Sequence, residues 1–139
     1  MRKNTPVSEY MTRKVVVAEP DNAFSQVQQL FVEYNIHHLP VVYDDRLIGI
    51  ISSNDVMKVY ATKLSGLEDT SPASLDEHFS IDGLMTHEPT SIHPEEPLAK
   101  AIDILSEGKF QALPVIDDEG KIVGIISNKD MVRILRDEI

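Results

Sequence analysis

Two stretches of this chain carry nearly the same sequence. Residues 49–60 read GIISSNDVMKVY and residues 124–135 read GIISNKDMVRIL, and in both a serine precedes an aspartate by three positions. Aligning the chain with itself also pairs Met11-Thr12 with Met85-Thr86. This pairing and that of the two GIIS stretches belong to one alignment if one residue is inserted near Gly120. The chain therefore contains a duplication, and two copies predict a pseudo-symmetric pair whose apolar faces cover each other.

The first copy predicts a strand, a helix, a hairpin and a second helix. The strand is expected at Val15–Ala18, and the helix after it has apolar residues at helical spacing and a start that Asp21 or Asn22 could cap. These apolar residues are Phe24, Val27, Leu30, Phe31 and Tyr34. Two strands, LPVVY and LIGIIS, follow around a tight acidic turn at Asp44-Asp45, and a helix begins around Asn54.

The second copy repeats this order. Its first strand is expected at Thr90–Ile92, its helix stops at Gly108, and its hairpin strands read ALPVI and IVGIIS before a last helix. The stretch between the copies contains Gly66, Pro72 and several serines, which indicates a helix tail followed by a linker. We therefore expect one repeat at 7–62, a linker at 63–79 and a second repeat at 80–139 of an α/β protein.

Composition excludes several classes of protein. A hydrophobic content of 42% is typical of a globular chain, and no apolar stretch is long enough to cross a membrane. The net charge of −10, without a basic patch, argues against nucleic acid and anionic membrane surfaces as partners. Without cysteine there are no disulfides and no thiolate metal sites, and the N-terminus does not resemble a secretory signal, so a cytoplasmic protein is expected.

The ordered pattern MT, P, LPV, GIIS and D, present twice, resembles the cystathionine-β-synthase (CBS) domain. The tandem arrangement is similar to the paired unit of that family, the Bateman module. The resemblance implies two βαββα repeats packed about a pseudo-twofold axis, with clefts between them that bind adenosine-containing ligands. It also implies a regulatory, energy-sensing role without catalysis, AMP, ADP, ATP or S-adenosylmethionine as ligand, with magnesium left open, and a disc-shaped homodimer that signals to an effector protein.

The repeated serine and aspartate have two readings. In the first, they form a capping box, in which the serine hydroxyl satisfies a free amide of the first helical turn and the carboxylate reaches back. In the second, a strand end and a helix start favour phosphate, while the carboxylate accepts ribose hydroxyls. The resemblance gives the ribose role to Asp55 and Asp130, and a ribose or phosphate contact to Ser52 and Ser127.

Basic residues beside these motifs are candidates for binding phosphate. His37 and His38 precede the LPV strand of the first copy, where the second copy has Gln111-Ala112, and they resemble a phosphate clamp. A clamp of this kind should strengthen as the pH falls through about 6.5, although two solvated histidines are the alternative. Lys58 and Arg133 occupy matching positions three residues after the aspartates and rank below them as candidates.

The resemblance also places an adenine pocket near the first strand of each copy. Its candidate residues are Val15, Val16, Ile36 and Pro40 in the first copy and Thr90, Ser91, Phe110 and Pro114 in the second. The alternative is that they are core residues, and for Ile36 and Phe110 the core reading is slightly favoured.

Three functions remain open at this stage. The first is a sensor of an adenine nucleotide or adenosyl ligand, and the second is a structural module that mainly dimerises. Dimerisation would use the apolar residues of the helices that follow the two motifs, namely Val56, Met57, Val59, Met131, Val132, Ile134 and Leu135. The third, an enzyme or metal site, is the least supported, because adjacent histidines on a strand point to opposite faces and His87 and His93 have no recognised ligand spacing.

Overall fold

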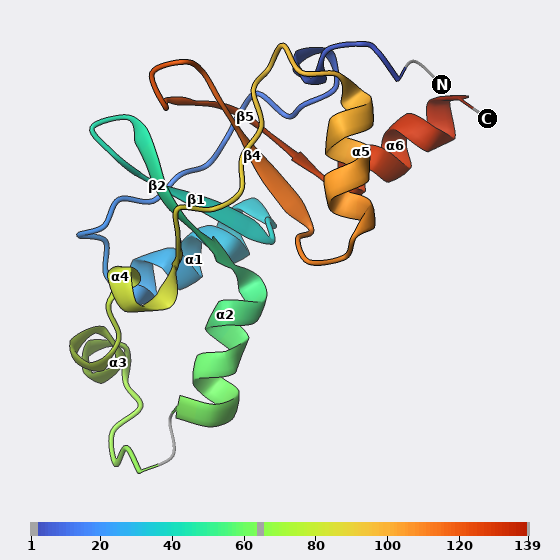
Figure 1. Ribbon diagram of the computed structural model, residues 1–139. Coiled ribbons are helices and arrows are strands. Elements are labelled where there is room, and N and C mark those ends of the chain that lie inside the picture. The colour runs from blue at the N-terminus through green and yellow to red at the C-terminus, as the bar shows by residue number, and fades with distance from the viewer. Residues whose placement is uncertain (1–2, 64–65, 139) are drawn as a thin grey trace. The chain divides into compact units, whose positions relative to one another are not determined.

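The computed structural model describes residues 3–63 and 66–138, so residues 64 and 65 of the expected linker and residue 139 of the second repeat lie outside it. The chain divides into two compact units (Figure 1). Unit 1 takes the described residues of Met1–Val15, Asp45–Leu47 and Pro89–Ile139, and unit 2 takes Val16–Asp44 and Ile48–Glu88. Each unit has its own apolar core.

Unit 2 contains a small sheet with helices beside it. Strands β1 (His38–Tyr43), β2 (Arg46–Ser52) and β3 (Thr86–His87) lie in that order, and β2 pairs antiparallel with β3. The first two residues of β2, Arg46 and Leu47, are assigned to unit 1. Both residues of the turn from β1 to β2, Asp44 and Asp45, have positive φ angles of 52° and 64°. That geometry suits a two-residue hairpin and confirms the hairpin predicted from the sequence.

The helices of unit 2 bury the apolar positions read from the sequence only in part. Helix α1 (Phe24–Tyr34) buries Phe24, Val27 and Phe31, whereas Tyr34 is exposed. Helix α2 (Ser53–Lys58) continues into a π-helical turn at Val59–Lys63. The predicted cap of α1 is wrong: Ala23 is the cap residue, its N–H donates to the side chain of Gln26, and the side chain of Asn22 accepts from the N–H of Glu19.

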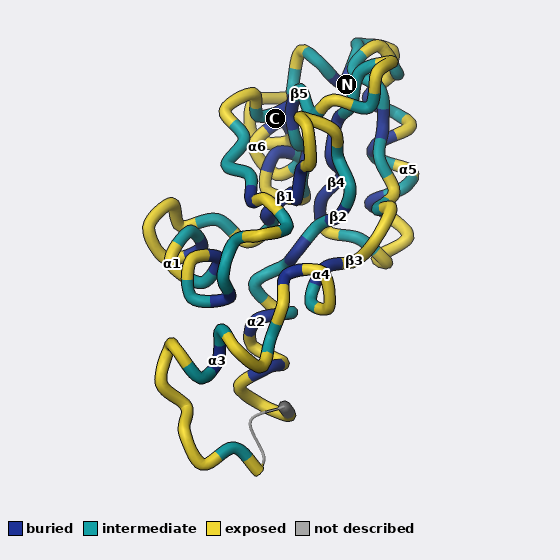
Figure 2. Tube along the Cα trace, turned by 90° about the vertical axis from the view of Figure 1, so that its left-hand side faces the viewer, coloured by how far each residue is buried: buried dark blue, intermediate teal, exposed yellow. Residues whose placement is uncertain are grey.

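The expected linker holds two short helices that the sequence analysis missed. These are α3 (Pro72–His78) and α4 (Ile81–Leu84), each begun by a serine that accepts a backbone N–H. Asp76 of α3 accepts from the N–H and the hydroxyl of Ser25 on α1, at 2.8 Å each, and Leu75 is buried. Helix α3 is thus packed onto the first repeat, while most of the chain just before it is exposed (Figure 2).

Unit 1 repeats the hairpin and helices with the second copy. Strands β4 (Ala112–Ile116) and β5 (Ile122–Ser127) pair antiparallel, with a register shift at Val115/Ile116. Helices α5 (Leu98–Ser106) and α6 (Asn128–Glu138) contact β4 and β5 respectively (Figure 1). A short 3₁₀ helix at Val7–Glu9 completes this unit. The predicted helices and hairpin of the second copy are therefore confirmed.

The first residues of each repeat pack with the other repeat. Met11 lies against Gly124 of β5 in unit 1, and Met85 lies against Gly49 of β2 in unit 2. Neither glycine has room for a Cβ, because the methionine side chain occupies that space. Both methionines are buried, at 8% and 7% exposure, so the core built mainly by one repeat includes a methionine from the start of the other repeat.

The strands expected at Val15–Ala18 and Thr90–Ile92 are wrong as strands. Each is reduced to one parallel bridge, Ala18 to Val41 and Ile92 to Val115. The hydrogen bonds match in the two copies: Ala18 donates to the carbonyl of Pro40 at 2.9 Å, and Ile92 donates to that of Pro114 at 3.0 Å. The side chain of Ala18 is buried in the core of unit 2, and that of Ile92 in the core of unit 1.

Candidate functional site

The first serine–aspartate motif lies where β2 ends and α2 begins. Ser52 is the cap residue of α2, and its hydroxyl accepts from the N–H of Asp55 at 3.2 Å. The Oδ2 atom of Asp55 accepts from the N–H of Ser52 at 2.7 Å and from its hydroxyl at 3.0 Å. No donor among residues 3–63 and 66–138 reaches the other carboxylate oxygen, Oδ1. The capping-box reading is therefore confirmed, and one oxygen of the partly buried carboxylate is still available.

The second motif has the same box and additional donors. Ser127 donates to Oδ2 of Asp130 from its N–H at 2.8 Å and from its hydroxyl at 3.1 Å. The Oδ1 atom accepts from the hydroxyl of Thr12 at 3.1 Å and from the guanidinium of Arg133. Asp130 is only 3% exposed, so this carboxylate is buried and hydrogen-bonded on both oxygens.

Thr12 is a site residue that the sequence analysis missed. It lies next to Ile125 of β5, and the two residues exchange backbone hydrogen bonds at 2.8 and 2.9 Å. The repeat alignment supplied a signal, because Met11-Thr12 and Met85-Thr86 were matched. Thr86, in β3, pairs with Ile50 of β2, but it is exposed. The partner role of Thr12 thus has no counterpart of the same kind around Asp55 in the part of the chain that the structure describes.

The two histidines lie in different environments. His37 is exposed, and its carbonyl accepts from the N–H of Ser53 at 2.9 Å. His38 begins β1 and is partly buried, and burial lowers its pKa below 6.5, with a smaller contribution from His37 that the nearby Asp55 opposes. His38 is therefore mainly neutral at pH 7, which moves its charging to lower pH than the clamp reading assumed.

Lys58 and Arg133 match in sequence but not in their partners. Arg133 forms an ion pair with Asp130 three residues earlier on α6, and its side chain is half exposed. Lys58 is exposed, and within the described ranges it makes no ion pair. The structure therefore holds one of these two phosphate candidates against the aspartate of its own motif.

The candidate adenine residues divide between the two units. Unit 2 holds Val16, Ile36 and Pro40, of which Val16 and Ile36 pack against its core while Pro40 is buried. Unit 1 holds the rest: Val15, Thr90, Ser91, Phe110 and Pro114. Phe110 packs against the core of unit 1, Pro114 is buried, and Thr90 is exposed. Ile36 and Phe110 thus lie partly in core packing, as the alternative reading expected.

The described residues offer neither a clustered metal site nor a membrane-spanning helix. Within residues 3–63 and 66–138, no three His, Asp or Glu side chains gather as a metal site would require. The Nε2 atom of His87 lies 2.9 Å from the backbone carbonyl oxygen of Asp82, and the Nδ1 atom of His93 lies 3.3 Å from Oδ1 of Asp118. None of the described helices has both the length and the apolar character needed to cross a bilayer.

The sequence profile of the CBS domain matches the chain twice, at residues 7–62 and 80–137. The chain belongs to the CBS domain family. The two matches form a tandem pair, and the predicted mixed α/β fold with two CBS repeats is confirmed by solved CBS pairs. One of these, the CBS domain pair of protein MJ0100 in complex with 5′-methylthioadenosine and S-adenosyl-L-methionine, has a TM-score of 0.82 at 24% identity over 97% of this chain and 98% of that one.

Two further relatives are more similar in sequence. The structure of CBSX2 in complex with AMP is 28% identical, with a TM-score of 0.78 over 96% of this chain and 98% of that chain. Uncharacterized protein MJ0188 of Methanocaldococcus jannaschii is 33% identical over 129 residues, which is 91% of this chain but 43% of that protein.

The chain covers even less of some related enzymes. It is 29% identical to the homoserine O-acetyltransferase of Methanococcoides burtonii over 95% of its own length, but over only 24% of that enzyme. The chain thus spans less than half of these curated relatives, and the shared part is the CBS pair.

Proposed function

We propose that this CBS pair is a regulatory module that binds an adenosine-containing ligand and passes the signal to a separate effector protein. The repeats expected at 7–62 and 80–139 would act as one module, with one ribose-reading motif contributed by each. Ligand binding regulates because it favours the arrangement of the module that binds the ligand better. In this proposal the CBS pair itself catalyses nothing.

The observation that carries the proposal is the carboxylate of Asp55. It is fixed by Ser52 through Oδ2 at the start of α2, while Oδ1 has no donor from the described residues. A ribose presents two neighbouring hydroxyl donors, and a carboxylate oxygen has two lone pairs to receive them. Acidic side chains read ribose hydroxyls in this way in dinucleotide-binding folds.

The rest of the ligand would be held by the other sequence candidates. We assign phosphate to His37, His38, Lys58 and Arg133. Burial lowers the pKa of His38, so its ring would act as a neutral hydrogen-bond donor near pH 7. Adenine would lie against the apolar candidates of each repeat, such as Val16 in the first and Phe110 in the second. The CBSX2 complex with AMP, at 28% identity, supports an adenine nucleotide as the ligand class.

Thermal-shift titration tests this proposal. Protein freed of co-purified nucleotide is heated with AMP, ADP, ATP or S-adenosylmethionine, each with Mg²⁺ and with EDTA. A ligand at a hundred times its Kd stabilises the folded state by about 2.7 kcal/mol, which is a clear shift in Tm. Asp55→Ala should abolish the response to the ligand that stabilises the wild type.

The matched control is Asp69→Ala, because Asp69 is an exposed acid outside both motifs. It should respond to ligand as the wild type does. If no adenosine-containing ligand stabilises the wild type, or if the double variant Asp55→Ala/Asp130→Ala still responds fully, the sensor proposal is wrong.

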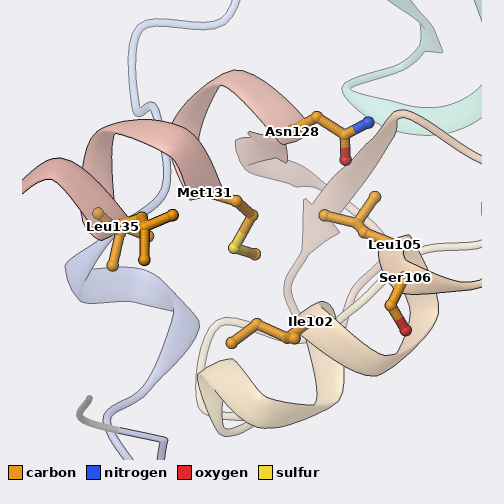
Figure 3. Close-up of a pocket in the computed structure, with 7 residues that line it drawn as sticks. Ile102, Leu105, Ser106, Asn128, Met131 and Leu135 are labelled. Carbon is orange, nitrogen blue, oxygen red and sulfur yellow. The ribbon is translucent and has the colours of Figure 1, made fainter.

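A second candidate function is dimerisation, and one surface favours it. A groove of about 290 Å³ lies between α5 and α6 in unit 1, lined by Ile102, Leu105, Ser106, Asn128, Met131, Ile134 and Leu135. Met131 extends from α6 toward the space that Ile102 borders on α5 (Figure 3). On the same helix Val132 is 66% and Leu135 48% exposed, so α6 presents apolar surface to solvent. We propose a second copy of the chain as its occupant.

Three of the residues expected at a dimer surface are excluded from it. Val56, Val59 and Ile134 are buried, at 7%, 0% and 6% exposure, because they face the cores of their own units. Met57, Met131, Val132 and Leu135 remain. Sedimentation equilibrium of wild type and Leu135→Glu tests the dimer: a shift from dimer to monomer supports it, and a monomeric wild type at micromolar concentration refutes it.

A further inference from the structure

The two motifs differ in how many acceptor sites their aspartates have left. An ionised carboxylate offers about four lone-pair sites, two on each oxygen. At Asp130 four donors reach the carboxylate: the N–H and hydroxyl of Ser127 on Oδ2, and Thr12 and Arg133 on Oδ1. At Asp55 only the two donors of Ser52 are present among the residues that the structure describes, both on Oδ2. The Asp130 carboxylate is full, whereas the Asp55 carboxylate can still accept two.

We propose that Arg133 is an internal competitor for the ribose position of the second motif, so that the Asp55 motif binds adenosine ligands first. This inference rests on the proposed function, because it concerns the same ribose-reading carboxylates. A ribose at Asp130 must displace a donor from Oδ1 before its hydroxyls can bind. At Asp55 the ribose enters without displacing any donor from the described residues.

Arg133, rather than Thr12, is the donor that leaves. Its side chain is half exposed, so the guanidinium can move into water and keep its hydrogen bonds there. Thr12 is partly buried and is fixed by its backbone bridge to Ile125. Displacing Arg133 separates it from a buried carboxylate, and ribose hydroxyls replace only the hydrogen bond and not the charge.

Lys58 does not do the same at Asp55, although the spacing is identical. Lys58 follows Asp55 by three residues on α2, and Arg133 follows Asp130 by three residues on α6. A guanidinium carries planar donors that fit a carboxylate, whereas a lysine ammonium is a strongly hydrated point charge on a flexible stem. The residue type at this position therefore decides, together with Thr12, whether the second oxygen of the aspartate is open or occupied from within the chain.

Released Arg133 would also be free to contact a phosphate of the entering ligand. Adenosine has the ribose without phosphate, so for adenosine the displaced guanidinium only competes. For AMP the same side chain can regain a partner. Removing Arg133 should thus help adenosine more than AMP, which is an effect that a purely structural role would not produce.

Isothermal titration calorimetry with adenosine tests the proposal in backgrounds that isolate each motif. Asp55→Asn leaves the Asp130 motif, and adding Arg133→Gln there should tighten adenosine binding about 5- to 30-fold, the factor that corresponds to losing a competing pair worth one to two kcal/mol. Asp130→Asn leaves the Asp55 motif, and adding Lys58→Arg should weaken adenosine binding. If Arg133→Gln folds poorly, the milder change Arg133→Lys takes its place, and it should also tighten adenosine binding.

The outcomes separate this inference from the proposed function. Wild type should bind one adenosine tightly and lose it in Asp55→Asn but not in Asp130→Asn, and AMP should gain less than adenosine from Arg133→Gln. Unchanged adenosine affinity on removing Arg133, or a tight site lost in Asp130→Asn instead, overturns the inference while the sensor function stands. If neither adenosine nor AMP binds any variant, the sensor function is wrong and the inference falls with it.

Discussion

Replacing Asp130 by alanine should destabilise the protein considerably more than replacing Asp55. Both aspartates close a capping box with a serine three residues earlier. Only Asp130 also accepts from Thr12 and Arg133, and it is 3% exposed where Asp55 is partly exposed. Asp55→Ala thus removes a capping box alone, whereas Asp130→Ala removes a capping box and the hydrogen bonds from Thr12 and Arg133.

The magnitude follows from these contacts. Losing the reciprocal bond of a capping box costs about 1 kcal/mol, and this is the whole loss expected for Asp55→Ala. Asp130→Ala also removes the bond from Thr12 and a charge-assisted bond from Arg133, the second discounted because the guanidinium is half exposed. We expect a total loss of about 2–3 kcal/mol in the free energy of unfolding.

Urea unfolding of ligand-free protein, followed by far-UV circular dichroism, measures this difference. The chain has no tryptophan, so intrinsic tryptophan fluorescence is not an option. Thr12→Val serves as a matched control, since it removes one donor and keeps the carboxylate, and it should lose about 1 kcal/mol. Equal losses for Asp55→Ala and Asp130→Ala would refute the argument that the extra donors stabilise the second motif.

Two further predictions concern packing and pH. Gly49→Ala should lower the free energy of unfolding by about 1–3 kcal/mol. The added methyl group would meet the side chain of Met85 and lie 3.0 Å from the backbone carbonyl oxygen of Thr86. Gly124→Ala should cost less, since it meets only the flexible side chain of Met11; urea unfolding that ranks the two in reverse contradicts this. His38 should make stability fall as pH drops below about 6.5, because its lowered pKa means that the unfolded chain binds the proton first. His38→Ala should flatten Tm between pH 5 and 7.5, and an unchanged slope would count against it.

The local elements could be predicted because their signals are local. The hairpin at Asp44-Asp45, the helix from Phe24 and the helices after each motif all appear where apolar spacing and turn residues placed them. The same is true of the capping boxes, in which the interacting residues are three positions apart.

Interactions between distant residues could not be predicted in this way. Helix α3 was read as linker because its segment is rich in serine, and it is stabilised by Asp76 binding Ser25, 51 residues away. Val56 and Ile134 were expected at a surface since an apolar helical face looks the same whether it meets the core or another molecule. The strand expected at Val15–Ala18 is reduced to one bridge, from Ala18 to Val41 of β1, and the apolar character of the segment did not reveal how far this pairing extends.

The sequence by itself determined the duplication, the CBS repeats and the two serine–aspartate motifs, because repeats and capping spacings are written in neighbouring residues. The tertiary structure alone decided which methionine fills which core and how the two aspartates differ. Thr12 reaches Asp130 across 118 residues of chain, and Arg133 pairs with a carboxylate while the matching Lys58 does not. Such contacts depend on where folding brings atoms together. An alignment of the two copies treats Asp55 and Asp130 as equivalent, and likewise Lys58 and Arg133, although their contacts differ.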